Sequence, residues 1–231
     1  MFEFDGKVAI VTGASSGIGQ RTAEMLAQRG ARVAVFARST EKLKQLESAS
    51  VLAVAGDVSV LEDIERLFST TESHFGHVDV LVNNAGMIDP APLIDTTFDE
   101  WKEMFAVNVH GVFLTCRRAL PSMIERRAGA IVNVASISGV PGPEKFPGWV
   151  SYCASKGAVI SLTEALAVEV KAHGVRVNCV SPGSVDTSMW AEASGGAPAS
   201  MTPEEVAETI LFLASDRSRP MNGQNLNVYS A

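Results

Sequence analysis

Cysteine is scarce in this sequence, and its few copies are scattered. Cys116, Cys153 and Cys179 are the only three in 231 residues, and no two of them form a C-x-x-C pair. A disulfide framework uses a denser, even set, so we interpret these residues as reduced thiols of a cytoplasmic protein. The four histidines have no spacing typical of metal ligands, and we predict no metal site.

Basic residues are also in short supply. The chain has 19 Lys and Arg against 26 Asp and Glu, a net charge of −7. Binding of a phosphate backbone needs concentrated positive charge, so no nucleic-acid partner is expected. No apolar run approaches the roughly 20 residues that cross a bilayer. The opening residues, MFEFDGKVAIVTG, lack the basic and apolar regions of a secretory signal. We therefore expect no membrane partner.

What the chain does have is a regular alternation of apolar and helix-like segments. Strands are expected over 7–13, 31–37, 51–58, 78–86, 129–136, 174–183 and 225–229. Helices are expected over 19–30, 60–74, 98–127, 150–173 and 203–214. Strands that are apolar throughout and alternate with helices are typical of a parallel sheet covered on both faces. The prediction is an α/β, doubly wound, Rossmann-like fold in a single domain over 1–231.

A glycine-rich turn, TGASSGIG (12–19), lies between the first expected strand and the first expected helix. Glycines there permit a tight turn, close approach of a pyrophosphate to the backbone, and close packing of helix on strand. The same turn could also be no more than a tight strand–helix connection. Residues of this turn assigned to a dinucleotide are Gly13, Ser15, Ser16, Gly17, Ile18 and Gly19.

The end of the second strand bears on the choice of cofactor. NAD-binding folds place an Asp or Glu there for the ribose 2′-hydroxyl, whereas this chain has Arg38 followed by Ser39. An arginine suits a 2′-phosphate, so NADP(H) is preferred and NAD(H) remains possible. Arg38 as a solvated charge is the alternative interpretation. After the third strand, Asp57 and Val58 are expected to contact the adenine.

These motifs together resemble the short-chain dehydrogenase/reductase family in its compact form. The matching residues, in the family's order, are Thr12-Gly13-x-x-x-Gly17-Ile18-Gly19, Asn83-Asn84-Ala85-Gly86, Asn108, Ser136, Tyr152-x-x-x-Lys156, Pro182-Gly183 and Thr187. The sequence looks most like ketoacyl reductases of the acyl-carrier-protein type and polyol and hydroxysteroid dehydrogenases. The resemblance implies a seven-stranded parallel sheet, a nicotinamide cofactor, and a homodimer or homotetramer built on the two long helices.

The catalytic set implied by the resemblance is Asn108, Ser136, Tyr152 and Lys156. Tyr152 and Lys156 are four positions apart and share one helix face. A free tyrosine has a pKa of about 10, and a neighbouring cation is expected to lower it toward the working range of an acid–base group. Ser136 is placed to hydrogen-bond the substrate oxygen. By resemblance, Asn108 bends its helix and holds a water that passes protons to Lys156, which also reaches the nicotinamide ribose.

Further residues are expected to line the cofactor or the substrate. Those near the cofactor are Asn83, Asn84, Ala85, Gly86, Pro182, Gly183, Val185 and Thr187. Those expected to form an apolar substrate pocket are Met87, Val140, Phe146, Trp149, Met189 and Trp190. A substrate loop is expected over about 187–202. It is short for the family, which suggests an open site or one completed by a partner subunit.

The sequence also departs from the family in two other places. The segment from Ser136 to Tyr152 is a few residues longer than the commonest spacing, and the extra residues fall in 141–149. The C-terminal residues NGQNLNVYSA lack the usual Asp-Gly-Gly, which weakens the case for a tetramer.

The function predicted from the sequence is hydride transfer between NADP(H) and a small-molecule carbonyl or secondary alcohol, with an apolar substrate favoured. An NAD-dependent alcohol or polyol dehydrogenase is one alternative. A cofactor-binding regulator without turnover is an alternative of another class, and the intact catalytic set argues against it. An epimerase or dehydratase of the longer sister family is disfavoured by the glycine spacing.

Overall fold

A single seven-stranded sheet organises the chain in the computed structural model, which describes residues 3–143 and 145–229. All strands are parallel, in the order β3-β2-β1-β4-β5-β6-β7. The strands are β1 (Val8–Thr12), β2 (Arg32–Ala37), β3 (Val51–Ala55), β4 (Val80–Asn83), β5 (Gly129–Val134), β6 (Val175–Pro182) and β7 (Asn225–Val228). The predicted doubly wound, Rossmann-like α/β fold is confirmed.

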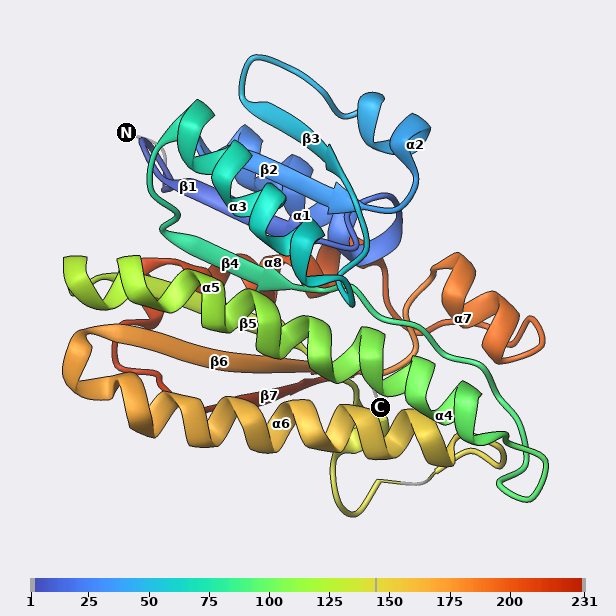
Figure 1. Ribbon diagram of the computed structural model, residues 1–231. Helices are drawn as coiled ribbons and strands as arrows, with labels where there is room; N and C mark the ends of the chain where they lie inside the picture. The colour runs from blue at the N-terminus through green and yellow to red at the C-terminus, as the bar shows by residue number, and fades with distance from the viewer. Residues whose placement is uncertain (1–2, 144, 230–231) are drawn as a thin grey trace.

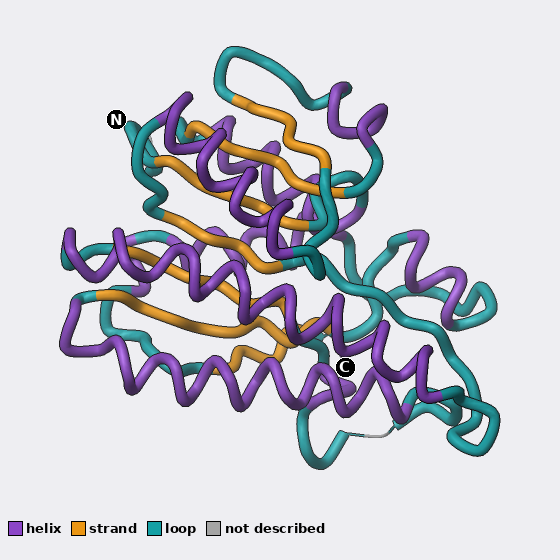
Figure 2. The backbone as a smooth tube through the Cα atoms, viewed as in Figure 1, coloured by secondary structure: helices purple, strands orange, loops and turns teal. Residues whose placement is uncertain are grey.

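Helices cover both faces of this sheet (Figures 1 and 2). They are α1 (Gly17–Gln28), α2 (Thr40–Lys44), α3 (Leu61–Phe75), α4 (Phe98–Phe105), α5 (Gly111–Arg126), α6 (Val150–Val170), α7 (Ser188–Ala193) and α8 (Pro203–Ala214). The first face carries α1 and α8, and the second carries α3, α5 and α6. None of the helices in the described part of the chain is both long and apolar enough to span a membrane.

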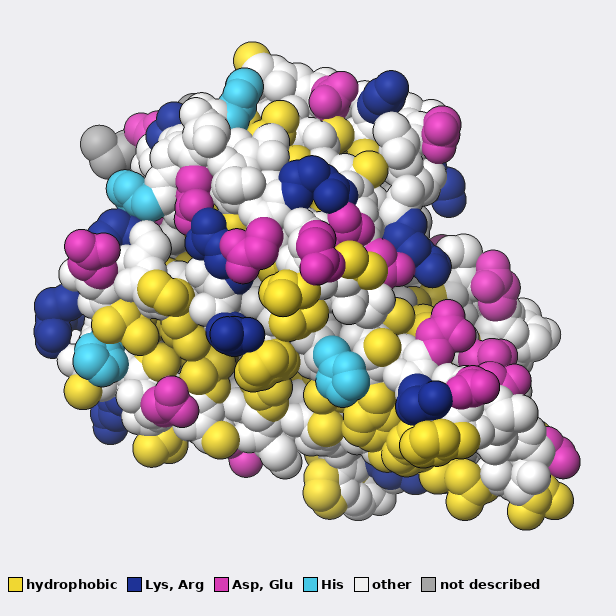
Figure 3. Space-filling view, in the orientation of Figure 1, with side chains coloured by type: hydrophobic (Ala, Val, Ile, Leu, Met, Phe, Trp, Pro, Cys, Tyr) yellow, Lys and Arg dark blue, Asp and Glu magenta, His cyan; other side chains and the backbone are white. Residues whose placement is uncertain are grey.

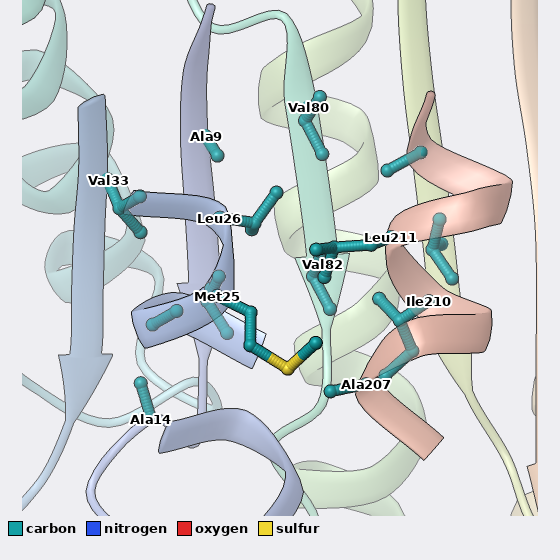
Figure 4. Packing of buried hydrophobic residues seen from close by; sticks show 14 of the residues in the cluster. Ala9, Ala14, Met25, Leu26, Val33, Val80, Val82, Ala207, Ile210 and Leu211 are labelled. Carbon is teal, nitrogen blue, oxygen red and sulfur yellow. The ribbon is translucent and has the colours of Figure 1, made fainter. Parts of the chain in front are cut away.

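The strands are apolar on both sides because both sides are buried. In β1, Ala9 and Val11 pack with α1 and α8, while Ile10 between them packs with the helices of the other face. Figure 4 shows the first of these cores, where Leu26 of α1 and Leu211 of α8 meet over the sheet. Period-2 alternation therefore separates two apolar environments rather than core from solvent.

The long helix predicted over 98–127 is interrupted. The α4 helix ends at Phe105, a π-helical turn covers Ala106–His110, and α5 continues from Gly111. A π-helical turn holds one residue more than an α-helical turn, and it often marks a functional position. The short helices α2 and α7 were not predicted. Thr202 caps α8 in a reciprocal pair with Glu205.

The carboxyl edge of the sheet is where the chain reverses its order of strand addition. From β1 the chain builds outward through β2 and β3, and then returns to place β4 on the other side of β1. In open α/β sheets, this switch point is the usual position of a ligand crevice. The loops that leave β1, β4, β5 and β6 all meet there.

Replacement of Leu211 by alanine tests the core between α1, α8 and the sheet. Leu211 is fully buried, so Leu211→Ala should lower the free energy of unfolding by about 2–5 kcal/mol. Leu93 is 56% exposed, and Leu93→Ala is the matched control, with an expected change within about 0.5 kcal/mol. Urea unfolding followed by circular dichroism measures both. Equal losses would contradict the described packing.

Candidate active site

A cavity of about 750 Å³ lies at this carboxyl edge. Its walls come from the loops after β1 to β6, from the start of α6, and from α7. The predicted site residues found in its lining are Gly13, Ser15, Ser16, Gly17, Ile18, Arg38, Ser39, Asp57, Val58, Asn84, Ala85, Gly86, Ser136, Tyr152, Lys156, Pro182, Gly183, Val185 and Thr187. The predicted apolar residues found there are Met87, Phe146, Trp149, Met189 and Trp190.

Four predicted residues lie outside this lining: Gly19, Asn83, Asn108 and Val140. We expected Asn83 to line the cofactor, but its side-chain amide is buried among protein partners. It donates to Asn133 Oδ1 at 2.9 Å and accepts from Thr115 Oγ1 at 2.7 Å. This side chain ties β4 to β5 and α5, and it has no contact with the cavity.

The glycine turn is held against the exit of β4. Gly13 has φ 65°, and a Cβ there would lie 2.7 Å from Ala85 Cα. A Cβ on Gly19 would lie 2.4 Å from the Gly13 carbonyl oxygen, so Gly19 serves helix packing rather than lining. Asn84 Nδ2 donates to the carbonyl oxygens of Thr12 and Gly13, each at 3.1 Å. Only glycine fits these close approaches.

One end of the cavity is polar and lies beside β2 and β3. Arg38 is exposed at its rim, and Ser39 occupies the N-cap position before α2. Asp57 accepts from the backbone N–H and the hydroxyl of Ser59, at 2.8 and 2.7 Å, so its carboxylate is oriented by its own loop. No acidic residue stands at the position of Arg38, as the sequence analysis noted.

At the centre of the cavity, Tyr152 and Lys156 lie one turn apart on α6, and both are buried. Lys156 Nζ lies 5.7 Å from the centroid of the Tyr152 ring and donates to the Val134 carbonyl oxygen at 2.9 Å. Burial lowers the pKa of Lys156 to about 8. Burial raises the pKa of Tyr152 to about 12, against the opposing effect of its hydrogen bond with Ser136.

From the sequence we expected neighbouring cations, Lys156 and the nicotinamide, to lower the pKa of Tyr152, whereas burial raises it in the structure. The desolvation of a fully buried phenol outweighs its favourable contacts. Lys156 itself is poorly solvated and points to the end of β5. At neutral pH in this state, Tyr152 therefore carries its proton.

Ser136 follows β5 and is held close to Tyr152 by a tight packing of backbones. Its hydroxyl accepts from the Ser138 N–H at 3.1 Å and caps a short 3₁₀ turn. Gly139 ends that turn against α6, where a Cβ would lie 2.5 Å from the carbonyl carbon of Lys156. The absence of a side chain at Gly139 brings the β5 loop and the Tyr152–Lys156 face together.

Asn108 lies in the π-helical turn and is fully buried beside the cavity. Its Oδ1 accepts from the Met87 N–H at 2.8 Å, and its Nδ2 donates to the Met87 carbonyl oxygen at 2.9 Å. Nδ2 also donates to Ser155 Oγ at 3.0 Å. The side chain thus fixes the β4 exit to α6, a structural role that the sequence analysis did not anticipate.

The segment after β6 forms a closed loop over the cavity. Val185 pairs with Met201, and the Asp186 N–H donates to the Met201 carbonyl oxygen at 2.8 Å. Thr187 caps α7 by accepting from the Trp190 N–H at 3.2 Å. The predicted substrate loop over about 187–202 lies within this closed segment.

Sequence reasoning missed several lining residues, among them Ile88, Glu103, Val107 and Tyr229. Glu103 and Val107 are four positions apart just before Asn108, so helical spacing could have placed them on one side. Tyr229 comes from the end of β7, and no local pattern marks it. In the described ranges, no three His, Cys, Asp or Glu side chains gather where a metal ion could bind.

The residues present fit a dinucleotide. Glycine backbones line one wall where side chains would protrude, an arginine stands at the polar end, and a buried Tyr–Lys pair with a serine marks the centre. A family model described as short chain dehydrogenase matches residues 7–197. The chain belongs to the short-chain dehydrogenase family. It is an NAD(P)-dependent oxidoreductase of that type.

Individual relatives support this family assignment. An uncharacterized oxidoreductase of Staphylococcus aureus (strain MW2) is 37% identical over 216 residues, which cover 92% of each chain. The 3-ketoacyl-(acyl-carrier-protein) reductase of Brucella melitensis, solved in complex with NADH, is 32% identical with a TM-score of 0.90 over 97% of each chain. Levodione reductase is 29% identical with the same TM-score, over 97% of this chain and 96% of its own.

The buried lysine gives a prediction for stability. Folding lowers the pKa of Lys156 from its usual 10.5 to about 8, so the unfolded chain holds more protons between these values. Wild-type stability therefore gains about 3 kcal/mol from this group as pH rises from 8 to 10.5. Lys156→Met should lack that gain, so its stability relative to wild type should fall across the same window.

Urea unfolding at pH 7.5, 9 and 10.5 measures this difference. Lys171→Met, at an exposed lysine, is the matched control, and its difference from wild type should not vary across the window. A constant difference between wild type and Lys156→Met would mean that Lys156 is solvated in the folded protein.

Proposed function

We propose that this protein is an NADP(H)-dependent reductase of apolar ketones, working through Ser136, Tyr152, Lys156 and Asn108. The observation that carries the proposal is the buried Tyr152–Lys156 pair on one face of α6, beside Ser136, inside the cavity at the carboxyl edge of the sheet. Burial of a lysine and a tyrosine side by side costs desolvation energy, and packing alone does not require these polar groups. Together they suit proton transfer to a substrate oxygen.

A nicotinamide cofactor bound in this cavity would supply a hydride to the carbonyl carbon. As the C=O π bond opens, the oxygen gains negative charge, and the hydroxyl of Ser136 donates a hydrogen bond to it. The hydroxyl of Tyr152 then gives its proton to this oxygen, which completes the alcohol. Lys156 stabilises the resulting phenolate through its charge. Oxidation of an alcohol is the same sequence in reverse.

Tyr152 and Lys156 can each hold a proton that the reaction uses. With a pKa of about 12, Tyr152 holds the proton that reduction consumes. Lys156, with a pKa of about 8, can carry a positive charge beside Tyr152 and can also pass a proton to Tyr152 near neutral pH. Asn108 lies near Lys156, since a Cβ on Gly86 would lie 3.2 Å from Lys156 Nζ and 3.3 Å from Asn108 Oδ1. We assign Asn108 the holding of a water that passes protons to Lys156.

The preference for NADP(H) rests on Arg38. Its guanidinium stands at the cavity rim where a 2′-phosphate would lie after the second strand, and Ser39 adds a hydroxyl. The NADH complex of the 32% identical Brucella reductase supports the alternative of an NAD-dependent dehydrogenase. A regulator that binds cofactor without turnover is the candidate of another class, and the complete Tyr–Lys–Ser set argues against it.

Three other expectations stay predictions. They are a single domain over 1–231, a cytoplasmic location, and a homodimer or homotetramer. Exposed Phe113 of α5, and Val150 and Val168 of α6, support an association through the two long helices. Figure 3 shows hydrophobic side chains gathered along these helices.

Removal of the Tyr152 hydroxyl tests the mechanism. Tyr152→Phe should lower kcat for ketone reduction by at least about 100-fold, because the proton donor is lost. Oxidation of NADPH followed by absorbance measures kcat. The fluorescence of bound NADPH and the thermal unfolding midpoint are the controls, and both should stay close to wild type. A variant that keeps most of its kcat would rule out the assigned role of Tyr152.

Reversal of the charge at Arg38 tests the cofactor preference. Arg38→Asp should raise the KM for NADPH by about 10-fold or more, and should leave the KM for NADH unchanged or lower. Lys42→Asp, at an exposed lysine of α2 outside the lining, is the control for a general field effect. If both variants change the two KM values alike, Arg38 does not contact the phosphate.

A further inference from the structure

A second serine stands beside Ser136 in the wall of the cavity. Ser138 lies in the short 3₁₀ turn Ile137–Gly139 that follows Ser136, and it lines the same cavity. It is 5% exposed, so it is as deeply buried as the residues at the reacting centre. The proposed reaction uses the hydroxyl of Ser136 but not that of Ser138.

The hydroxyl of Ser138 has no hydrogen-bond partner among the described residues. Every fully enclosed side-chain nitrogen or oxygen in the described part of the chain does have a partner. The Ser138 hydroxyl is therefore not fully enclosed, and the surface that it reaches is that of the cavity.

The other buried hydroxyl and titratable side chains of the described lining differ from Ser138 in this respect. Ser136 accepts from the Ser138 N–H and bonds to Tyr152, and Lys156 donates to the Val134 carbonyl oxygen. Ser138 is thus the buried lining residue whose hydroxyl is left for a ligand.

Three contacts fix the turn that carries Ser138. Its N–H donates to Ser136 Oγ at 3.1 Å, and Gly139 packs directly on the backbone of α6. From the solvent side, the Lys145 ammonium donates to the carbonyl oxygens of the first residue of the turn and of the residue after it, at 3.3 and 2.5 Å. Three covalent bonds join the Ser138 nitrogen to its Oγ, so the two serine hydroxyl oxygens are at most about 7.5 Å apart.

The surroundings make this hydroxyl costly to leave without a partner. Around Tyr152 the cavity is lined by apolar side chains, including Met87, Trp149 and Trp190. Water can bond to Ser138 while the cavity is open to solvent, but a wholly apolar substrate would displace that water and offer no replacement. A substrate that places an oxygen against Ser138 keeps the hydroxyl bonded.

Building on the proposed function, we infer that Ser138 binds a second oxygen of the substrate, one or two carbons from the reacting carbonyl. The substrate class is then an oxygenated ketone on an apolar skeleton. Ser136 and Tyr152 hold the reacting oxygen, and Ser138 holds the second one. Two polar contacts in an otherwise apolar pocket fix the orientation of the substrate. Ser138 determines specificity in this way and takes no part in proton transfer.

Two matched pairs of ketones test this inference. 1-Hydroxy-1-phenylpropan-2-one and 1-phenylpropan-2-one differ by a hydroxyl on the carbon next to the carbonyl. 4-Hydroxy-4-phenylbutan-2-one and 4-phenylbutan-2-one differ by a hydroxyl one carbon further away. Each hydroxyketone is assayed as separate enantiomers with NADPH. In at least one pair, wild-type kcat/KM should be about 3- to 10-fold higher for the hydroxyketone, and the pair that responds gives the position of the second oxygen.

Ser138→Ala separates this contact from the intrinsic reactivity of the ketones. The variant keeps the N–H that binds Ser136, so kcat/KM should fall about 3- to 10-fold for the preferred hydroxyketone and less than about 2-fold for its partner. Ser151→Ala, at a similarly buried serine outside the lining, is the control and should leave the ratio unchanged. Equal losses within both pairs, or a rise only in the KM for NADPH, would overturn the inference.

Binding gives a readout that does not need turnover. NADP⁺ cannot reduce a ketone, and Trp149 and Trp190 line the cavity, so quenching of tryptophan fluorescence with NADP⁺ present measures the Kd of each ketone. Tighter binding of the hydroxyketone that is lost in Ser138→Ala, without turnover under NADPH, would support the role of Ser138 and reject the proposed reductase. Reduction of the ketones with the same preferences in wild type and Ser138→Ala would do the reverse.

Discussion

The hydrogen bonds between the exits of β1 and β4 fix the point on which the rest of the site depends. Thr12 Oγ1 accepts from the backbone N–H groups of Asn84 and Ala85, each at 3.1 Å, and the Asn84 amide returns bonds to Thr12 and Gly13. These contacts join two neighbouring parallel strands, after which the chain leads to opposite halves of the sheet. The glycine turn, the loop at Gly86 and the floor of the cavity all take their positions from this junction.

A second set of buried polar contacts extends the same rigidity to the catalytic helix. Asn83 bonds to Asn133, and Asn133 Nδ2 donates to Thr163 Oγ1 of α6 at 2.9 Å. Asn108 adds the link from Met87 to Ser155. Fully satisfied networks of this kind specify one arrangement of their elements. Here they hold α6 at a fixed distance from β4 and β5, so the Tyr152–Lys156 face is preorganised.

The fold and most of the site could be predicted because they depend on local patterns. Apolar strands, glycines at Gly13 and Gly17, and the Tyr152–Lys156 spacing each carry their own signal. The bend at Asn108 was expected from the resemblance alone, because the hydrogen bonds of Asn108 with a loop 21 positions away leave no local signal in the sequence. The raised pKa of Tyr152 depends on tertiary burial, which no spacing encodes. Asn83 was misassigned because the sequence motif does not show that its amide turns inward.

The pairing of Val185 with Met201 marks the two ends of a segment that lies outside the sheet and covers the cavity. The residues between them leave the sheet and return at one place, and within this segment Trp190 packs on Phe146 and Trp149 ahead of α6. Substitutions in this segment can therefore alter the substrate pocket, while Tyr152 and Lys156 lie on a different element, α6. The protein thus carries part of its substrate pocket on a segment separate from the helix that carries Tyr152 and Lys156.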